Sequence, residues 1–200
     1  MAPSIFNGSH AFENEVHRVK RTTSSQPLPD SNLSNRTMAS GVAINEEVDK
    51  YFKEVRVRTH GSCEDDRLKL VVFCMNSTIT EIVVDKERTK LVKEFHGEDD
   101  VFKKVVSMLP PDDCRYALYD CTYETKETLK EDLIFIMWAP DTASLKSRMV
   151  YAASKAALKA KFPGLKHELQ VNDPSDCDPS CLVDKLGGRG VVTKLEKKAV

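Results

Sequence analysis

The chain has 200 residues, of which 40% are hydrophobic and 30% charged, and its formal net charge is −1. This length is enough for one domain with a substantial core. The balanced charge excludes a general attraction to polyanions such as nucleic acids, and no run approaches the roughly 20 apolar residues of a membrane-spanning helix. We therefore expect one domain, no transmembrane segment, no nucleic-acid partner, and any basic site confined to a local patch.

The first 37 residues differ in composition from the rest, because they are rich in Ser, Asn and Pro. Such a composition predicts loop rather than packed structure, and it contains no apolar segment typical of a secretory signal. We interpret residues 1–37 as a disordered N-terminal extension or, alternatively, as the product of an upstream start, with Met38 as the first functional residue. The domain then covers residues 38–200.

The expected elements begin with a helix capped by Asn45, in which Val48, Phe52 and Val55 recur at i, i+4 and i+7. A strand at 68–75 pairs with one at 80–84 in a hairpin, and the charged stretch 86–100 is expected to be a loop. A helix at 101–109, with Val101, Val105 and Met108 facing inward, ends at two prolines. Further strands are predicted at 115–122, 133–139 and 165–171, with a charged link at 124–132 and a helix at 180–186 that Ser180 caps and two glycines end.

This order of elements predicts an α/β (α+β) domain, in which a mixed sheet of about five strands is covered by helices on both faces. The six cysteines contain no Cys-x-x-Cys pair, so free thiols in a reducing compartment are expected. The five histidines are scattered, and the motifs of hydrolases and nucleotide-binding enzymes do not occur. We expect no metal, no cofactor and no enzymatic activity.

Residues 143–162 predict the longest helix, because they contain no Gly or Pro and many alanines. Thr142 or Asp141 can cap its start, and Pro163-Gly164 ends it. Tyr151, Leu158 and Phe162 form a stripe that fits packing on a core. A second apolar stripe is formed by Leu145, Met149, Ala152, Ala153 and Ala156. This stripe indicates either a helix buried on two sides or a surface that binds a partner.

The charges of this helix are all positive, and they belong to Lys146, Arg148, Lys155, Lys159 and Lys161. The last two suit the negative C-terminal end of the helix dipole. Lys146 and Arg148 lie near the N-terminus, where each cation costs roughly 0.3–1 kcal/mol at an exposed site. A pair of unfavourably placed cations beside an apolar stripe favours a binding function for this end of the helix.

The chain from residue 38 onward resembles the actin-depolymerising factor/cofilin family. The resemblance rests on several motifs in order, namely MASGV at 38–42, DCRYALYD at 113–120, YETKE at 123–127, WAPDTA at 138–143, LKSRMVYA at 145–152 and KHELQ at 166–170. It implies an actin-depolymerising factor homology domain that binds actin monomers and filament sides, and that severs and depolymerises filaments. It also implies a monomer in the cytoplasm and cytoskeleton.

The resemblance assigns roles residue by residue. Contact with both monomer and filament would use Ser40, Gly41, Lys146, Arg148, Met149 and Ser154. The additional filament-side contact would use Lys130, Asp132 and Glu168. Ser40 would be phosphorylated by a kinase and dephosphorylated by a phosphatase. Phosphorylation would inhibit binding, because a phosphate of about −1.5 to −2 charges would repel an acidic partner. Phosphoinositide binding and pH sensitivity would use Lys159, Lys161, Lys166 and His167.

The sequence departs from its vertebrate relatives at four places. Leu129 stands where those proteins have a lysine, which leaves open a filament-side binder that does not sever, as in coactosin-like proteins. The acidic loop 62–67 replaces a lysine-rich nuclear import signal. Ser144 replaces a proline at the helix start, and Arg148 replaces a lysine; both keep the expected role. A phosphoinositide-binding membrane module is a further alternative.

Overall fold

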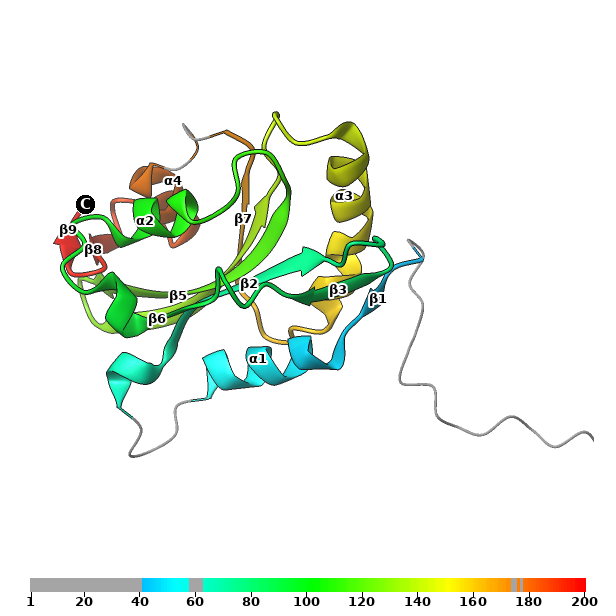
Figure 1. Cartoon of the computed structure of the whole chain (residues 1–200). Coiled ribbons are helices and arrows are strands. Elements are labelled where there is room, and N and C mark those ends of the chain that lie inside the picture. The colour runs from blue at the N-terminus through cyan, green and yellow to red at the C-terminus, as the bar shows by residue number, and fades with distance from the viewer. Residues whose placement is uncertain (1–40, 58–62, 174–175, 177) are drawn as a thin grey trace, which may run out of the picture. The chain divides into compact units, whose positions relative to one another are not determined.

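The computed structural model of the chain describes residues 41–57, 63–173, 176 and 178–200 (Figure 1). The predicted extension 1–37, Ser40 and Cys177 lie outside the described residues. The α-helices are α1 (Glu46–Arg56), α2 (Val101–Ser107), α3 (Leu145–Ala160) and α4 (Pro179–Lys185), and short 3₁₀ turns cover η1 (Glu64–Asp66) and η2 (Val92–Phe95). The strands are β1 (Ala43–Ile44), β2 (Leu68–Met75), β3 (Glu81–Val84), β4 (Lys90–Leu91), β5 (Arg115–Thr125), β6 (Leu129–Trp138), β7 (His167–Val171), β8 (Val192–Leu195) and β9 (Lys198–Ala199).

One mixed sheet joins all of these strands. Its main path runs β1-β3-β2-β5-β6-β7, with parallel pairs at β1–β3 and β6–β7 and antiparallel pairs between. β4 pairs with β2, and the C-terminal hairpin β8–β9 joins β5. The predicted class is confirmed. The five expected strands are β2, β3, β5, β6 and β7, and the four additional strands have only two to four residues each.

Helices cover both faces of the sheet, and each face has its own hydrophobic core (Figure 1). On one face α1 and α3 pack against β2, β5 and β6, with Val48, Phe52 and Val55 of α1 buried as expected. On the other face α2 and α4 cover a cluster that contains Trp138 and Tyr119. Strand β2 contributes to both cores because alternate residues of a strand point to opposite faces.

Several predicted boundaries and contacts are corrected by the structure. The stretch 86–100 is not only loop, because it contains β4 and η2, and the link 124–132 is shortened because β5 and β6 extend to a turn at 126–128. The buried side of α2 consists of Phe102, Val105 and Val106, while Val101 and Met108 are only partly buried. All three predicted residues therefore face the core, since Val101 and Met108 pack against it, but the prediction omitted Phe102 and Val106. Asp178 rather than Ser180 caps α4.

Candidate functional site

Helix α3 begins at a cap that differs from the predicted ones. The hydroxyl of Ser144 accepts a hydrogen bond from the backbone N–H of Ser147 at 3.1 Å, so Ser144 is the N-cap rather than Thr142 or Asp141. The turn before it is fixed because Thr142 donates a hydrogen bond to the carbonyl of Pro111. Ser144 thus satisfies a backbone donor that would otherwise lack a helical partner.

The predicted stripe of Tyr151, Leu158 and Phe162 is buried. The helix is shorter than the predicted 143–162, so Phe162 lies just after its C-terminal end. The ring of Phe162 stacks on Phe52 of α1 with centroids 4.8 Å apart. The Tyr151 hydroxyl accepts a hydrogen bond from the backbone N–H of Met75 at 2.9 Å, and the Tyr116 hydroxyl donates to the carbonyl of Tyr151. These contacts fix both the position and the rotation of α3 on the sheet.

The second apolar stripe of α3 faces solvent. Leu145 is 67% exposed and Met149 is 63% exposed, and Ala152, Ala153 and Ala156 are also exposed. The alternative in which α3 is buried on two sides is therefore wrong. The helix presents two large apolar side chains and a row of alanines, a combination that marks a binding surface when its members are contiguous.

The cations of this surface have different surroundings. Lys146 is exposed, and no ion pair within the described ranges involves it. Arg148 is partly buried and pairs with Asp141 in the preceding turn, with Nη1 and Oδ1 2.9 Å apart. Ser147 lies between the two cations, and its hydroxyl donates to Asp113 at 2.9 Å. Asp113 and Asp141 therefore supply, from outside the helix, the negative charge that α3 itself lacks in its first turn.

The other residues assigned to this surface lie in different places. Gly41 is exposed, with φ +72° and open space around it, a backbone conformation that favours glycine. Ser154 is only 1% exposed and lies on the packed side of α3, so its side chain is not available to a partner in this structure. Among the described residues, the exposed surface assigned to actin thus consists of Leu145, Lys146, Arg148 and Met149, with Gly41 near the start of the described chain.

The predicted filament-side residues occupy β6 and β7. Lys130 is exposed, whereas Asp132 accepts hydrogen bonds from the Tyr123 hydroxyl at 2.8 Å and from Lys166 Nζ at 3.1 Å. His167 Nε2 lies 3.6 Å from the same carboxylate. Burial alone would raise the pKa of Asp132, but the Tyr123 and Lys166 donors outweigh it, and the pKa is lowered. Asp132 is thus an ionised centre of a local polar network.

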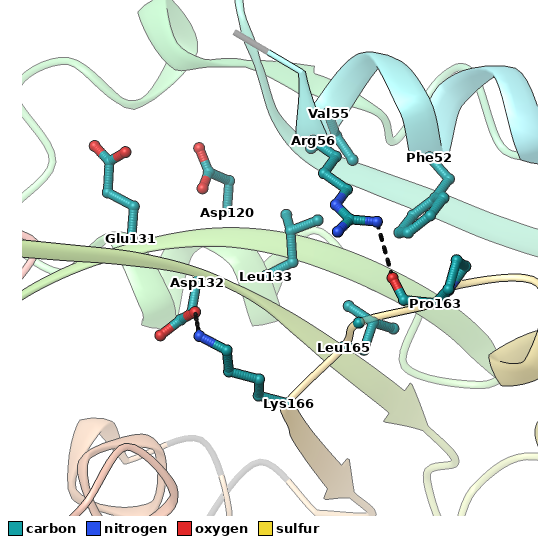
Figure 2. Close-up of a pocket in the computed structure, with 11 residues that line it drawn as sticks. Phe52, Val55, Arg56, Asp120, Glu131, Asp132, Leu133, Pro163, Leu165 and Lys166 are labelled. Atoms are coloured by element: carbon teal, nitrogen blue, oxygen red, sulfur yellow. Dashed lines mark hydrogen bonds and ion pairs between the residues drawn. The ribbon is translucent and has the colours of Figure 1, made fainter.

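Asp132 and Lys166 both line a cleft with a volume of about 240 Å³. Figure 2 shows the interaction between these two side chains. The cleft lies between the end of α1, strands β5 and β6, and the segment 163–166 that leads into β7. Arg56 closes one side by donating to the carbonyl of Pro163 at 3.0 Å. Acidic and basic side chains both line the cleft, so its charges are largely matched within the chain.

Glu168 and the lysines proposed for lipid contact are also paired. Glu168 accepts from Lys155 and Lys159; burial alone would raise its pKa, but these two ammonium groups outweigh burial and lower it. Lys161 Nζ lies 3.8 Å from Asp49, and Lys166 binds Asp132. The four residues assigned to phosphoinositides are therefore spread along the end of α3 and the start of β7, and three of the four are lysines with acidic neighbours.

The described part of the chain contains no group of three His, Cys, Asp or Glu side chains arranged to hold a metal ion. Within the same residues, no helix has both the length and the apolar character needed to cross a membrane. The five described cysteines are free thiols. Burial raises the pKa of Cys74 and of Cys114, which makes these thiols poor nucleophiles.

Reasoning from the sequence alone missed Asp113 and Ser147 as part of this site. Both belong to motifs that carry the family resemblance, DCRYALYD and LKSRMVYA, but neither was assigned a role. Their contact joins residues 34 positions apart, and no local spacing signals such a pair.

A mixed sheet anchors one long helix, and that helix leaves an apolar stripe and cations exposed, an arrangement typical of a protein-binding domain. The family model described as cofilin/tropomyosin-type actin-binding protein matches residues 41–187. The chain therefore belongs to the cofilin/actin-depolymerising factor family of actin-binding proteins.

Solved structures of this family are similar to the chain along nearly their whole length. A cofilin from Streptomyces griseoflavus is 31% identical, with a TM-score of 0.60, over 74% of this chain and 98% of that one. Actin depolymerization factor 2 from Plasmodium berghei is 26% identical, with a TM-score of 0.60, over 74% and 99%. The ADF-like protein UNC-60A from Caenorhabditis elegans is 27% identical, with a TM-score of 0.56, over 75% and 96%.

Proposed function

We propose that this chain binds actin monomers and filament sides through the exposed stripe of α3, and that it severs and depolymerises filaments. The observation that carries the proposal is the exposure of Leu145 and Met149 beside Lys146 and Arg148, on a helix whose opposite side is firmly packed. Such an arrangement fits an apolar cleft with acidic edges. Methionine adapts its shape to a cleft of this kind, and cations at the rim set its orientation.

The structure also suggests how Arg148 participates. Its partner Asp141 is largely exposed, and exposed ion pairs contribute only about 0–1 kcal/mol. An acidic group of actin can therefore replace Asp141 at little cost. Lys146 needs no such exchange, because it has no ion-pair partner among the described residues.

The test is the double substitution Lys146→Ala with Arg148→Ala, measured by co-sedimentation with filaments and by monomer binding. Both activities are expected to be lost while the melting temperature stays within a few degrees of the wild type. A matched control is Lys53→Ala with Lys50→Ala, which removes two exposed cations from α1. Co-sedimentation that survives the α3 substitutions would reject this surface.

Ser40 is proposed as the regulatory phosphorylation site, and it lies outside the described residues, directly before Gly41. A phosphate there would compete for the cations of α3 and repel acidic groups of actin. We expect Ser40→Glu to weaken actin binding and Ser40→Ala to preserve it. Equal affinities of the two variants would remove Ser40 from the proposal.

Lys130, Asp132 and Glu168 are proposed as the filament-side contact. A filament-side binder that does not sever is the second candidate, and Leu129 favours it, because this side chain is 62% exposed where relatives have a lysine. Imaging of single filaments separates the two candidates. Severing events at submicromolar protein support the first, and decoration without breaks supports the second.

Inhibition by phosphoinositides and pH sensitivity are proposed for Lys159, Lys161, Lys166 and His167. A protonated His167 would interact with Asp132, which Lys166 already binds. A change in the charge of one of these three groups would therefore alter the interactions of the other two. Binding to phosphoinositide vesicles that excess actin abolishes supports a shared surface. Vesicle binding that survives excess actin instead supports the membrane-module alternative. The proposed location is the cytoplasm and its cytoskeleton.

A further inference from the structure

Asp113 connects α3 to the sheet at the point where the proposed actin-binding surface begins. It lies in the turn between α2 and β5, far in sequence from α3. Its Oδ1 accepts from the Ser147 hydroxyl at 2.9 Å and from the backbone N–H of Cys114 at 2.9 Å. Its Oδ2 forms an ion pair with Arg115. Both oxygens of one carboxylate are thus engaged by three donors.

Arg115 connects Asp113 to Asp85 at the end of β3. Its side chain is mostly buried, and its Nε lies 3.2 Å from Oδ2 of Asp85, which in turn pairs with Arg88 at 3.2 Å. Asp85 is itself buried at the end of β3. Because each side chain is bound by the next, the orientation of Asp113 is fixed independently of α3. A side chain that such a network already holds loses little further conformational entropy when it binds another group, here Ser147.

The hydrogen bond to Asp113 holds the first turn of α3, which is the least stable part of the helix electrostatically. The first turn contains two cations and no acid, so the helix dipole and the side-chain charges oppose each other there. Ser147 and Tyr151 are four residues apart and therefore lie on the same side of the helix. Tyr151 anchors the second turn to Met75, and Ser147 anchors the first turn to Asp113.

The electrostatics agree with this geometry. Burial alone would raise the pKa of Asp113, but the hydrogen bonds from Arg115 and Ser147 outweigh it, so the pKa is lowered. The carboxylate is therefore ionised at neutral pH and accepts charge-assisted hydrogen bonds, which are stronger than neutral ones. Asp112, the adjacent residue, is exposed and provides a comparison with the same charge and nearly the same distance along the chain.

We propose that Asp113 is a positioning residue for actin binding: held by Arg115, it fixes Ser147 and thereby sets the register in which Lys146, Arg148 and Met149 face the partner. This inference rests on the proposed function of the α3 surface. Asp113 itself does not need to touch actin. Loss of the contact frees the first turn of α3 to fray, and a frayed turn must be ordered again at the moment of binding, which weakens the affinity.

The experiment measures the dissociation constant for actin monomers for Asp113→Asn, Ser147→Ala, the double variant and Ser147→Thr. Loss of a hydrogen bond to a charged group corresponds to about a tenfold weaker affinity if the whole effect appears in binding. We expect a loss of about fivefold to tenfold for Asp113→Asn and for Ser147→Ala, and no further loss in the double variant, because both substitutions act on one contact: Ser147→Ala removes the donor, and Asp113→Asn replaces the charged acceptor by a neutral amide. Ser147→Thr keeps the hydroxyl and is expected to restore the affinity, and Asp112→Asn is expected to bind as the wild type.

Hydrogen exchange supplies the second measurement. Amides 145–149 are expected to exchange faster in Asp113→Asn, while amides of α1 keep their protection. Wild-type affinity of Ser147→Ala, or losses that multiply in the double variant, would overturn the proposal. If Asp113→Asn does not fold, Ser147→Ala still decides, because it removes only the hydroxyl of a half-buried side chain. Lys146→Ala with Arg148→Ala tells the two ideas apart. If that pair abolishes binding and Ser147→Ala does not weaken it, only the positioning role fails; if the pair binds normally, the proposed surface itself fails.

Discussion

The C-terminal hairpin depends on one buried ion pair, and substitution of Glu196 provides a quantitative test of the fold. Strands β2 and β8 both pair with the edge of β5 that faces away from β6, β2 at 116–119 and β8 at 123–125. The Glu196 carboxylate fills the gap between them. It accepts from Lys69 Nζ at 2.8 and 3.0 Å, from the Tyr119 hydroxyl at 2.5 Å and from the Thr122 backbone N–H at 3.1 Å.

The expected magnitude follows from the burial of Lys69, which is only 5% exposed. Removing one member of a buried ion pair costs about 3–5 kcal/mol, because the other charge is left without compensation. Glu196→Gln keeps the side-chain length and one acceptor oxygen, so we expect a value near the lower limit, about 3 kcal/mol. For a domain of this size that corresponds to a fall in melting temperature of about 6–12 °C.

Urea denaturation is the appropriate assay, with the melting temperature as a second measurement. The midpoint is expected to fall while the slope m stays constant, because a local loss of stability leaves the surface exposed on unfolding unchanged. Glu87→Gln, at an exposed position, is the control and is expected to have no effect. Adding Lys69→Met removes the unpaired ammonium, so the double variant should lose at least about 1 kcal/mol less than the sum of the single losses. A loss below about 0.5 kcal/mol for Glu196→Gln, or strict additivity, would refute the reasoning.

Three further predictions concern pH, capping and the filament side. Asp132 and Glu168 have pKa values lowered from the usual 3.8 and 4.5, so their ionised forms stabilise the folded state above those values. Acid titration should show this stability being lost as the pH falls below about 4.5. Neutral substitutes at both positions should flatten the dependence of stability on pH. Ser144→Ala should cost about 1 kcal/mol in urea denaturation through loss of the α3 cap, whereas Ser77→Ala should cost nothing measurable. Leu129→Lys should leave stability within about 0.5 kcal/mol of the wild type and raise filament affinity in co-sedimentation; unchanged affinity would separate Leu129 from the filament contact.

Elements with strong local signals could be predicted from the sequence with accurate boundaries. The α1 helix has both a capping residue, Asn45, and a regular apolar spacing, and its observed buried residues are the predicted ones. Strand β2 is a continuous apolar run between polar segments, and its bounds agree with the prediction. In both cases, neighbours within a few positions determine the structure, so periodicity is sufficient.

Elements that depend on distant partners could not be predicted in this way. β8 and β9 are short, and their place on β5 depends on Glu196 reaching Lys69, 127 positions earlier. The buried face of α2 was predicted only in part, without Phe102 and Val106, because a helix of seven residues is too short for its apolar spacing to define the whole face. Phe102 is buried because its ring packs near Tyr119, with centroids 6.2 Å apart, a contact that no local pattern contains.

The exposed stripe of α3 shows why a surface of this kind needs both the structure and the family resemblance for its interpretation. An apolar stripe has the same spacing whether it is buried in its own domain or presented to another protein. Here the aromatic contacts of Tyr151 and Phe162, together with the Ser147–Asp113 hydrogen bond, hold the helix from one side only. Because folding does not need the other side, Leu145 and Met149 remain free for a partner, and the cations that weaken the isolated helix are compensated by Asp113 and Asp141 from neighbouring loops.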